Sequence, residues 1–192
     1  MNYWLFTRIH QLSNHNHILD SAMILITEKA IYMYALILLL IWIFGNRSYK
    51  ISVLQAGVTG ILGLAANYLL SLVYYEPRPF VAHHVDVLIH HAADASFPSD
   101  HTTGALAISI AFWLYHRKIG TCLIAFGLLT GFSRIWVGHH YPVDVLGSIL
   151  VALLVSLVMF RFSTYVQPLF ERIISLYESI LRKLRKAVSK TA

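Results

Sequence analysis

The stretch VDVLGSILVALLVSLVMFRF, from Val143 to Phe162, carries charged side chains only near its ends, at Asp144 and Arg161. A helix needs about 20 mostly apolar residues to cross the hydrocarbon of a bilayer, so this stretch predicts a membrane-spanning helix. The rest of the chain agrees, because 57% of all residues are hydrophobic, 12% are charged and the mean hydropathy is +0.63. Soluble domains contain about twice that share of charged residues. We therefore expect an integral membrane protein.

Four other apolar stretches are long enough, or nearly so, to span a membrane. They are Ser21–Phe44, Ile51–Tyr75, about Phe97–Tyr115 and Ile119–Val137. With the first stretch they predict an all-α, polytopic membrane helical bundle of about five transmembrane helices. We expect residues 1–192 to form one domain with its transmembrane core at residues 21–162. The stretch near Phe97 is short, so its first turn, with His101, must lie near the interface or in a protein-lined pocket.

Both flanks of this core predict helices that lie along the lipid headgroups. In residues 1–20, Asn2–Leu12 has apolar side chains at helical spacing. In residues 163–192, Leu169–Val188 alternates apolar pairs with basic residues, which is typical of amphipathic helices on an anionic leaflet. For this basic tail, a solvated extension is the alternative. Membrane lipids are therefore expected partners.

The basic residues predict the orientation, because cytoplasmic loops of membrane proteins carry an excess of Lys and Arg. Eleven of the fifteen Lys and Arg residues fall in Gly45–Lys50, in His116–Lys118 and in the tail from Arg161 onward. We assign these segments to the cytoplasm, which leaves the N-terminus outside the plasma membrane. Ten of the eleven histidines, all but His116, then lie on the outer face. This distribution explains the net charge of +6, so no nucleic-acid partner is expected.

Three polar fragments border the apolar stretches on the predicted outer face: Glu76–Pro79, Phe97–Thr103 and Ser133–Asp144. Ionisable groups at membrane depth are costly and mark functional sites. Together the fragments supply histidine, arginine, serine and carboxylate side chains, the set that a phosphoryl-transfer site without a metal needs.

The third fragment places His140 and Asp144 four residues apart. One turn of a helix that begins at Pro142 would stack the carboxylate beneath the imidazole. Such a carboxylate fixes the tautomer of the histidine and leaves its other ring nitrogen free as a nucleophile. The alternative is that Asp144 only caps the helix while His140 is an interfacial histidine.

The remaining candidates suit phosphate binding. Ser99 or Asp100 is a predicted helix N-cap, and a helix start favours phosphate. His101, in the same turn, is placed to act as a general acid. Arg78 and Arg134 suit a bidentate phosphate clamp, although either arginine alone could simply reach the headgroups.

Histidine doublets at 83–84, 90–91 and 139–140 raise the question of a metal. No pair has the spacing of a helical metal site, and the one cysteine is not near them in the sequence. We expect no metal and no other cofactor.

The three fragments resemble the signature of the type 2 phosphatidic-acid phosphatase superfamily: Lys-x6-Arg-Pro, Pro-Ser-Gly-His and Ser-Arg-x5-His-x3-Asp. The third motif is matched in full, the second lacks only its glycine, and the first lacks its lysine. The matching residues are Arg78, Pro79, Pro98, Ser99, His101, Ser133, Arg134, His140 and Asp144. Over almost the whole chain the sequence is also similar to the undecaprenyl-pyrophosphate phosphatases linked to bacitracin resistance in bacteria.

The resemblance implies a metal-independent phosphatase on the outer face of a bacterial plasma membrane. His140 would attack the terminal phosphorus and form a phosphohistidine, Asp144 would orient it, and His101 would protonate the leaving lipid phosphate. The phosphoryl oxygens would be held by Arg78, Arg134 and Ser99, with help from Ser133. The implied substrate is undecaprenyl pyrophosphate, whose hydrolysis recycles the cell-wall lipid carrier and counteracts bacitracin.

The departures from the signature lie at Ser71, where the family has lysine, and at Asp100, where it has glycine. We hypothesise that Glu76 or Asp100 positions Arg78 or His101, so that the site recognises pyrophosphate with fewer cations.

Other lipid phosphates stay open as substrates, because motifs do not separate them. Two other classes also stay open: a binding protein that sequesters lipid pyrophosphate without cleaving it, and a transporter or proton relay. The clustering of ionisable residues at one face argues against the relay. The sequence predicts no oligomeric state.

Overall fold

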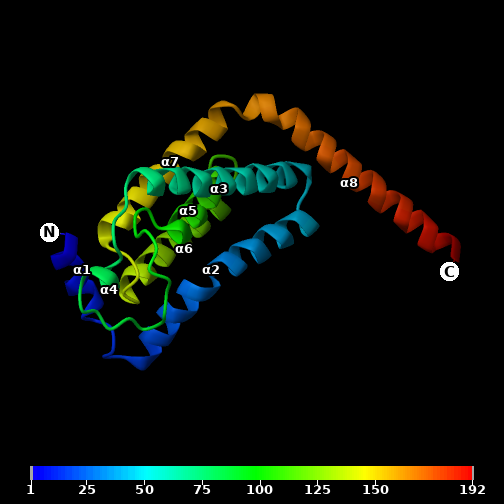
Figure 1. Cartoon of the computed structure of the whole chain (residues 1–192). Helices are drawn as coiled ribbons and strands as arrows, with labels where there is room; N and C mark the ends of the chain where they lie inside the picture. Colours follow the sequence, from blue (N-terminus) through cyan, green and yellow to red (C-terminus); the bar gives the residue numbers. More distant parts are fainter. Residues whose placement is uncertain (1, 192) are drawn as a thin grey trace.

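The computed structural model describes residues 2–191, so Met1 and Ala192, the ends of the predicted domain, lie outside the described residues. Figure 1 shows its helices, which follow one another along the chain: α1 (Asn2–His10), α2 (His17–Phe44), α3 (Arg47–Val73), α4 (Pro79–Ala82), α5 (Asp100–Trp113), α6 (Arg117–Trp136), α7 (Pro142–Arg161) and α8 (Ser163–Thr191). Across residues 2–191 the only β pairing is an isolated bridge between Pro77 and Ala95. The predicted all-α class is confirmed.

Four of these helices, α2, α3, α6 and α7, are long and apolar enough to cross a membrane. The fifth predicted span is shorter than expected, because α5 has 14 residues. At 1.5 Å per residue it is about 21 Å long, less than the roughly 30 Å of a hydrocarbon core. The other helices make this possible, since α5 packs against α3, α6 and α7 and most of its interior residues are buried.

Small residues let the helices approach α5 closely. On α6, a Cβ added at Gly131 would lie 3.0 Å from Thr102 of α5 and 2.9 Å from Val145 of α7. Glycine is therefore required where these three helices meet, as is typical of helix packing in membranes. The contact fixes the ends of α5, α6 and α7 that carry the polar fragments.

Buried hydrogen bonds tie the helices together. The Tyr34 hydroxyl of α2 donates to the Leu123 carbonyl of α6 at 2.7 Å and lies 2.8 Å from the Ser109 hydroxyl of α5. On α3, Asn67 Nδ2 donates to Thr103 Oγ1 at 3.0 Å. Such bonds are favoured between helices because hydrocarbon offers polar groups no other partner.

The N-terminal helix α1 does more than cover the surface. Phe6 is fully buried and packs with Ile135, Tyr141 and Val145. His10 lies 2.8 Å from the Trp136 carbonyl through Nδ1 and 3.1 Å from the Asp86 carbonyl through Nε2. The predicted interfacial helix therefore also packs over the connection between α6 and α7 and is hydrogen-bonded to it.

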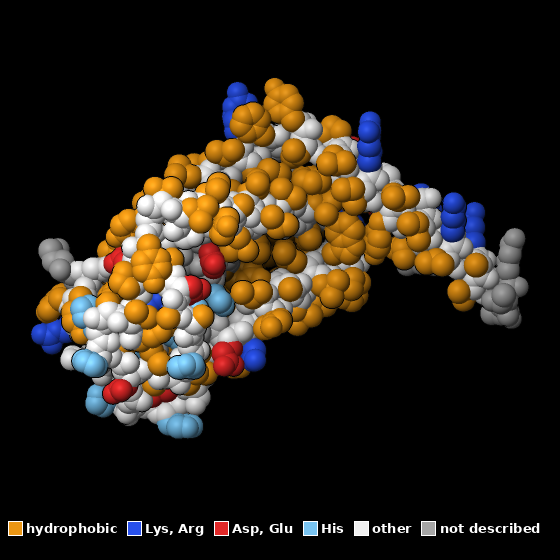
Figure 2. All heavy atoms as spheres, in the orientation of Figure 1, with side chains coloured by type: hydrophobic (Ala, Val, Ile, Leu, Met, Phe, Trp, Pro, Cys, Tyr) orange, Lys and Arg blue, Asp and Glu red, His pale blue; other side chains and the backbone are white. Residues whose placement is uncertain are grey.

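Charged side chains separate toward opposite ends of the bundle. In Figure 2 the histidines and most acidic side chains gather at the end that holds α1, an apolar band covers the middle, and Lys and Arg side chains line α8 beyond the other end. Arg47, at the start of α3, donates to Ser175 Oγ of α8 at 2.9 Å and so joins this helix to the bundle. The side chains of Arg185 and Lys190, counted in the predicted basic tail, lie outside the described part.

Candidate active site

A sharp turn between α6 and α7 carries two histidines into the protein. Gly138 has φ +91, a left-handed conformation that glycine adopts without strain. The amide groups of His139 and His140 then both donate to the Arg134 carbonyl, at 3.0 and 3.3 Å. Both imidazoles are almost completely buried as a result.

The imidazole of His140 is held in one tautomer. Its Nδ1 lies 2.8 Å from the Ser96 carbonyl oxygen, which can only accept a hydrogen bond, so Nδ1 carries the hydrogen. The other nitrogen, Nε2, lies 2.9 Å from Arg78 Nη1 and 3.4 Å from Arg134 Nη2. The lone pair of the neutral ring therefore faces two guanidinium groups.

Burial lowers the pKa of His140 well below the usual value of 6.5, and the positive charges of Arg134 and Arg78 lower it further. At neutral pH the imidazole is uncharged, so the lone pair on Nε2 is free for nucleophilic attack. A phosphoryl group bonded to this nitrogen would lie beside both arginines.

The two arginines come from different motifs and are both buried. Arg78, at the start of α4, donates from Nε to Asp94 Oδ1 at 2.7 Å and from Nη1 to the His139 carbonyl at 3.1 Å. Arg134 Nε is buried and has no hydrogen-bond partner within the described residues. Buried guanidinium groups with spare donors are suited to bind a phosphate bidentately.

Asp144 lies beneath His140, as its spacing predicted. Its Oδ2 is 3.4 Å from His140 Nδ1, and it accepts from the Tyr141 amide at 2.8 Å and from the Ser96 hydroxyl at 2.5 Å. The carboxylate therefore reaches the imidazole both directly and through Ser96.

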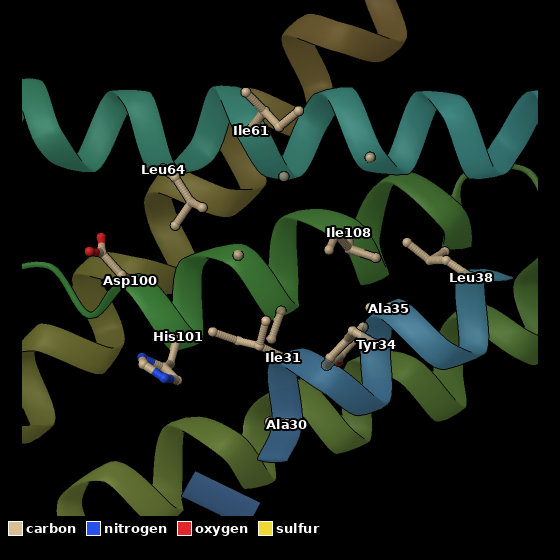
Figure 3. Close-up of a pocket in the computed structure, with 14 residues that line it drawn as sticks. Ala30, Ile31, Tyr34, Ala35, Leu38, Ile61, Leu64, Asp100, His101 and Ile108 are labelled. Carbon is tan, nitrogen blue, oxygen red and sulfur yellow. The ribbon is translucent and has the colours of Figure 1, made fainter. Parts of the chain in front are cut away.

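The second motif opens α5. Ser99 is its N-cap, since its hydroxyl accepts from the Thr102 amide at 3.5 Å and from Thr102 Oγ1 at 3.0 Å. His101 follows in the first turn and, with Asp100, lines one end of a cavity between α2, α3 and α5, as Figure 3 shows. Within residues 2–191 no hydrogen bond joins His101 to His140.

Three other predicted residues hydrogen-bond to groups other than the two arginines. Ser133 Oγ donates to the Thr130 carbonyl and accepts from Thr27 Oγ1, both at 2.8 Å. Asp100 accepts from Asn67 Nδ2 at 2.9 Å, and Glu76 accepts from the Tyr74 hydroxyl at 3.3 Å. The carboxylate that binds Arg78 is Asp94, so the hypothesis that Glu76 or Asp100 positions Arg78 is wrong, because the loop before α5 brings Asp94 to Arg78. That Glu76 or Asp100 positions His101 stays a hypothesis.

No group of three or more His, Cys, Asp or Glu side chains arranged to hold a metal ion is found within residues 2–191. Two of the doublets contact each other, since the ring centroids of His91 and His139 lie 4.7 Å apart in an edge-on arrangement. His139 Nε2 lies 2.9 Å from the Ile89 carbonyl, while His83 stacks on Tyr3 of α1.

A model of the PAP2 superfamily matches residues 52–168 of this chain. The chain belongs to the PAP2 superfamily. The matched residues contain all three motifs, so the predicted resemblance is confirmed, and with it the assignment of the chain as a membrane phosphatase.

Individual PAP2 relatives span nearly the whole chain. The chain is 63% identical to "Undecaprenyl-diphosphatase BcrC" of Bacillus subtilis (strain 168), over 97% of this chain and 96% of that protein. It is 27% identical to "Bacitracin transport permease protein BcrC" of Bacillus licheniformis, over 100% and 94% of the two chains. The crystal structure of Aquifex aeolicus LpxE shares its fold, with a TM-score of 0.67, 22% identity, and coverage of 83% of this chain and 94% of that one.

Two residues of this PAP2 site were missed by the sequence interpretation. The sequence predicts no role for Ser96 or Asp94. Ser96 stands directly before the Phe-Pro-Ser motif, and this adjacency was the available signal. Asp94 had none, because its pairing with Arg78 depends on how the loop folds.

Proposed function

We propose that this chain hydrolyses undecaprenyl pyrophosphate to undecaprenyl phosphate and inorganic phosphate. The observation that carries the proposal is the convergence of Arg78 and Arg134 on Nε2 of a buried, neutral His140. The 63% identity to a protein named as an undecaprenyl-diphosphatase supports the lipid assignment.

In the first step, Nε2 of His140 bonds to the terminal phosphorus while the bond from that phosphorus to the bridging oxygen breaks. His101, which must enter this step as the imidazolium, gives one proton to the departing oxygen of the lipid phosphate and becomes neutral. Arg78, Arg134 and Ser99 hold the phosphoryl oxygens and stabilise the charge that builds up on them. Ser133 assists only if its hydroxyl leaves the Thr130 carbonyl, to which it donates in the resting site. The phosphorylated ring is positively charged, and Asp144 stabilises it.

In the second step, water attacks the phosphohistidine and gives a proton to His101 while the bond between phosphorus and nitrogen breaks. Inorganic phosphate leaves, and both histidines return to their starting protonation states. The residues present supply every proton transfer, so the proposal includes no metal and no other cofactor.

The cavity beside His101 supports a substrate with a long apolar chain. Its volume is about 510 Å³, and away from Asp100 and His101 its lining is almost entirely apolar, with Ile31, Leu64 and Ile108 among the side chains (Figure 3). Its lining comes from α2, α3 and α5, and Figure 1 shows α2 and α3 diverging from the turn that joins them. The first isoprene units would lie in this cavity with the pyrophosphate at its polar end.

We place the site on the outer face of a bacterial plasma membrane, with the C-terminus in the cytoplasm. The distribution of Lys and Arg supports this orientation, since α8 and the turns before α3 and α6 carry most of them. There the enzyme would recycle the lipid carrier of peptidoglycan synthesis and remove the pyrophosphate form that bacitracin binds. Higher expression should then give higher bacitracin resistance.

Phosphate release tests the proposal. Purified protein in detergent with EDTA should release inorganic phosphate from undecaprenyl pyrophosphate and form an acid-labile, alkali-stable phosphohistidine. His140→Ala should abolish both while the variant unfolds at nearly the wild-type temperature. A requirement for added divalent metal, or full turnover by His140→Ala, would refute the histidine mechanism.

A further inference from the structure

The hydrogen-bond partner of His140 Nδ1 is a main-chain group. The Ser96 carbonyl is 2.8 Å from Nδ1, whereas the nearer oxygen of Asp144 is 3.4 Å away. The direction of the imidazole therefore depends first on where the Ser96 carbonyl points.

Ser96 is held on both sides of that carbonyl. Its amide donates to the Glu76 carbonyl at 2.8 Å, and its hydroxyl donates to Asp144 Oδ2 at 2.5 Å. Its side chain is fully buried, so water cannot replace either bond. The same Asp144 oxygen accepts from the Tyr141 amide, which fixes the carboxylate at the start of α7.

We infer that Ser96 is a positioning residue of the proposed hydrolysis, through which Asp144 holds His140 in its nucleophilic tautomer. The inference rests on the proposed function. In the resting site, the carboxylate binds the Ser96 hydroxyl, and Ser96 in turn presents its carbonyl to Nδ1. Asp144 then orients the histidine through Ser96 and acts directly, by its charge, once the ring is phosphorylated.

Turnover of Ser96→Ala tests this role. Losing a hydrogen bond to a charged group should lower kcat about 10- to 100-fold. The KM should stay within about twofold, since Ser96 binds neither arginine. Ser96→Thr keeps a hydroxyl and should recover most of the loss. Ser156→Ala is the matched control, because Ser156 is equally buried on α7 but donates to the Ala107 carbonyl, away from the site.

A double-mutant cycle separates positioning from general destabilisation. If Ser96 acts through Asp144, adding Ser96→Ala to Asp144→Asn should change kcat by less than about twofold. A residue that only stabilised the fold would add its full effect in that background and would also lower the unfolding temperature in proportion.

The nitrogen NMR signals of His140 give a readout that needs no substrate. In the wild-type chain they should report hydrogen on Nδ1, and in Ser96→Ala a mixture of tautomers. If the wild-type protein does not cleave the lipid, this spectrum still decides the inference while the proposed function fails. Unchanged signals together with unchanged turnover in Ser96→Ala would overturn it.

Discussion

Protonation of His139 should destabilise the fold in mild acid. This imidazole is 1% exposed, and its Nε2 lies 2.9 Å from the Ile89 carbonyl, to which it donates. Its Nδ1 is buried and has no partner among the described residues, so a proton added there would find no acceptor. His139→Gln keeps a donor for Ile89 and removes the titrating group.

The magnitude follows from linkage. Burial, with a smaller effect of Arg134, lowers the pKa of His139 from 6.5 to about 3. A pKa that is lower in the folded state adds stability above pH 6.5, and this stability is lost as the pH falls from 6.5 toward 3. At pH 5 the loss covers about 1.5 pH units, which is about 2 kcal/mol at 1.36 kcal/mol per unit. For a chain of this size that is a fall of about 4 to 8 °C in the unfolding temperature.

The assay is thermal unfolding of the wild type and of His139→Gln in the same detergent at pH 7 and pH 5. The variant should lose about 4 to 8 °C less than the wild type between the two values. His15→Gln, which removes an exposed histidine, is the control and should behave as the wild type. An equal loss in His139→Gln and the wild type would refute the reasoning.

Three further predictions concern the cavity, α8 and the arginines. A Cβ added at Gly57 meets no atom within 4 Å, so the side chain of Gly57→Leu should project into the cavity. This variant should raise the KM for a long polyprenyl pyrophosphate about tenfold and leave the KM for a short-chain pyrophosphate unchanged. The control variant Leu62→Phe, at an outward-facing position, should change neither KM. For α8, a fluorophore is attached to Ile180→Cys or to Arg182→Cys in a Cys122→Ser background, and the protein is placed in anionic vesicles. An aqueous quencher should reach the fluorophore at position 182 but not the one at position 180, because the apolar face of α8 lies on the membrane. Equal quenching at both positions would contradict a membrane-bound α8. Inorganic phosphate at 100 times its Kd should stabilise the wild type by about 2.7 kcal/mol in unfolding assays, and Arg134→Gln should lose most of this effect.

The membrane-spanning helices were predictable because each follows from the hydrophobicity of one continuous stretch of sequence. Apolar stretches of about 20 residues gave α2, α3, α6 and α7 to within a few residues, since lipid selects for continuous hydrophobicity. The length of α5 was not predictable in this way. Its 14 residues are tolerated because α3, α6 and α7 pack around it, and no single stretch of sequence encodes that contact.

The site was predictable as a set of motifs and only partly as a geometry. The spacing of His140 and Asp144 correctly placed one above the other, because both flank the first turn of one helix. The hypothesis that Glu76 or Asp100 positions Arg78 was wrong, since Asp94 reaches Arg78 from a loop that is held by the bridge between Pro77 and Ala95. Ser96 contributes its main-chain carbonyl as well as its hydroxyl. Every residue type has a main-chain carbonyl, so this contact could not be predicted from the identity of the residue.

The cation absent at Ser71 can be understood from the placement of the charges that remain. Ser71 Oγ binds the Tyr68 carbonyl of its own helix. Arg78 and Arg134 are 5% and 2% exposed, and at such burial their field on a phosphoryl group is stronger than that of solvated cations. Asp94 orients Arg78, but its side chain is 62% exposed, so water screens its charge more than that of the arginine. Because the Asp94 carboxylate is exposed to water and both guanidinium groups are buried, Asp94 orients Arg78 without neutralising much of its charge. In the proposed site, the positive charge of Arg78 and Arg134 then remains available to the phosphoryl group although lysine is absent at position 71.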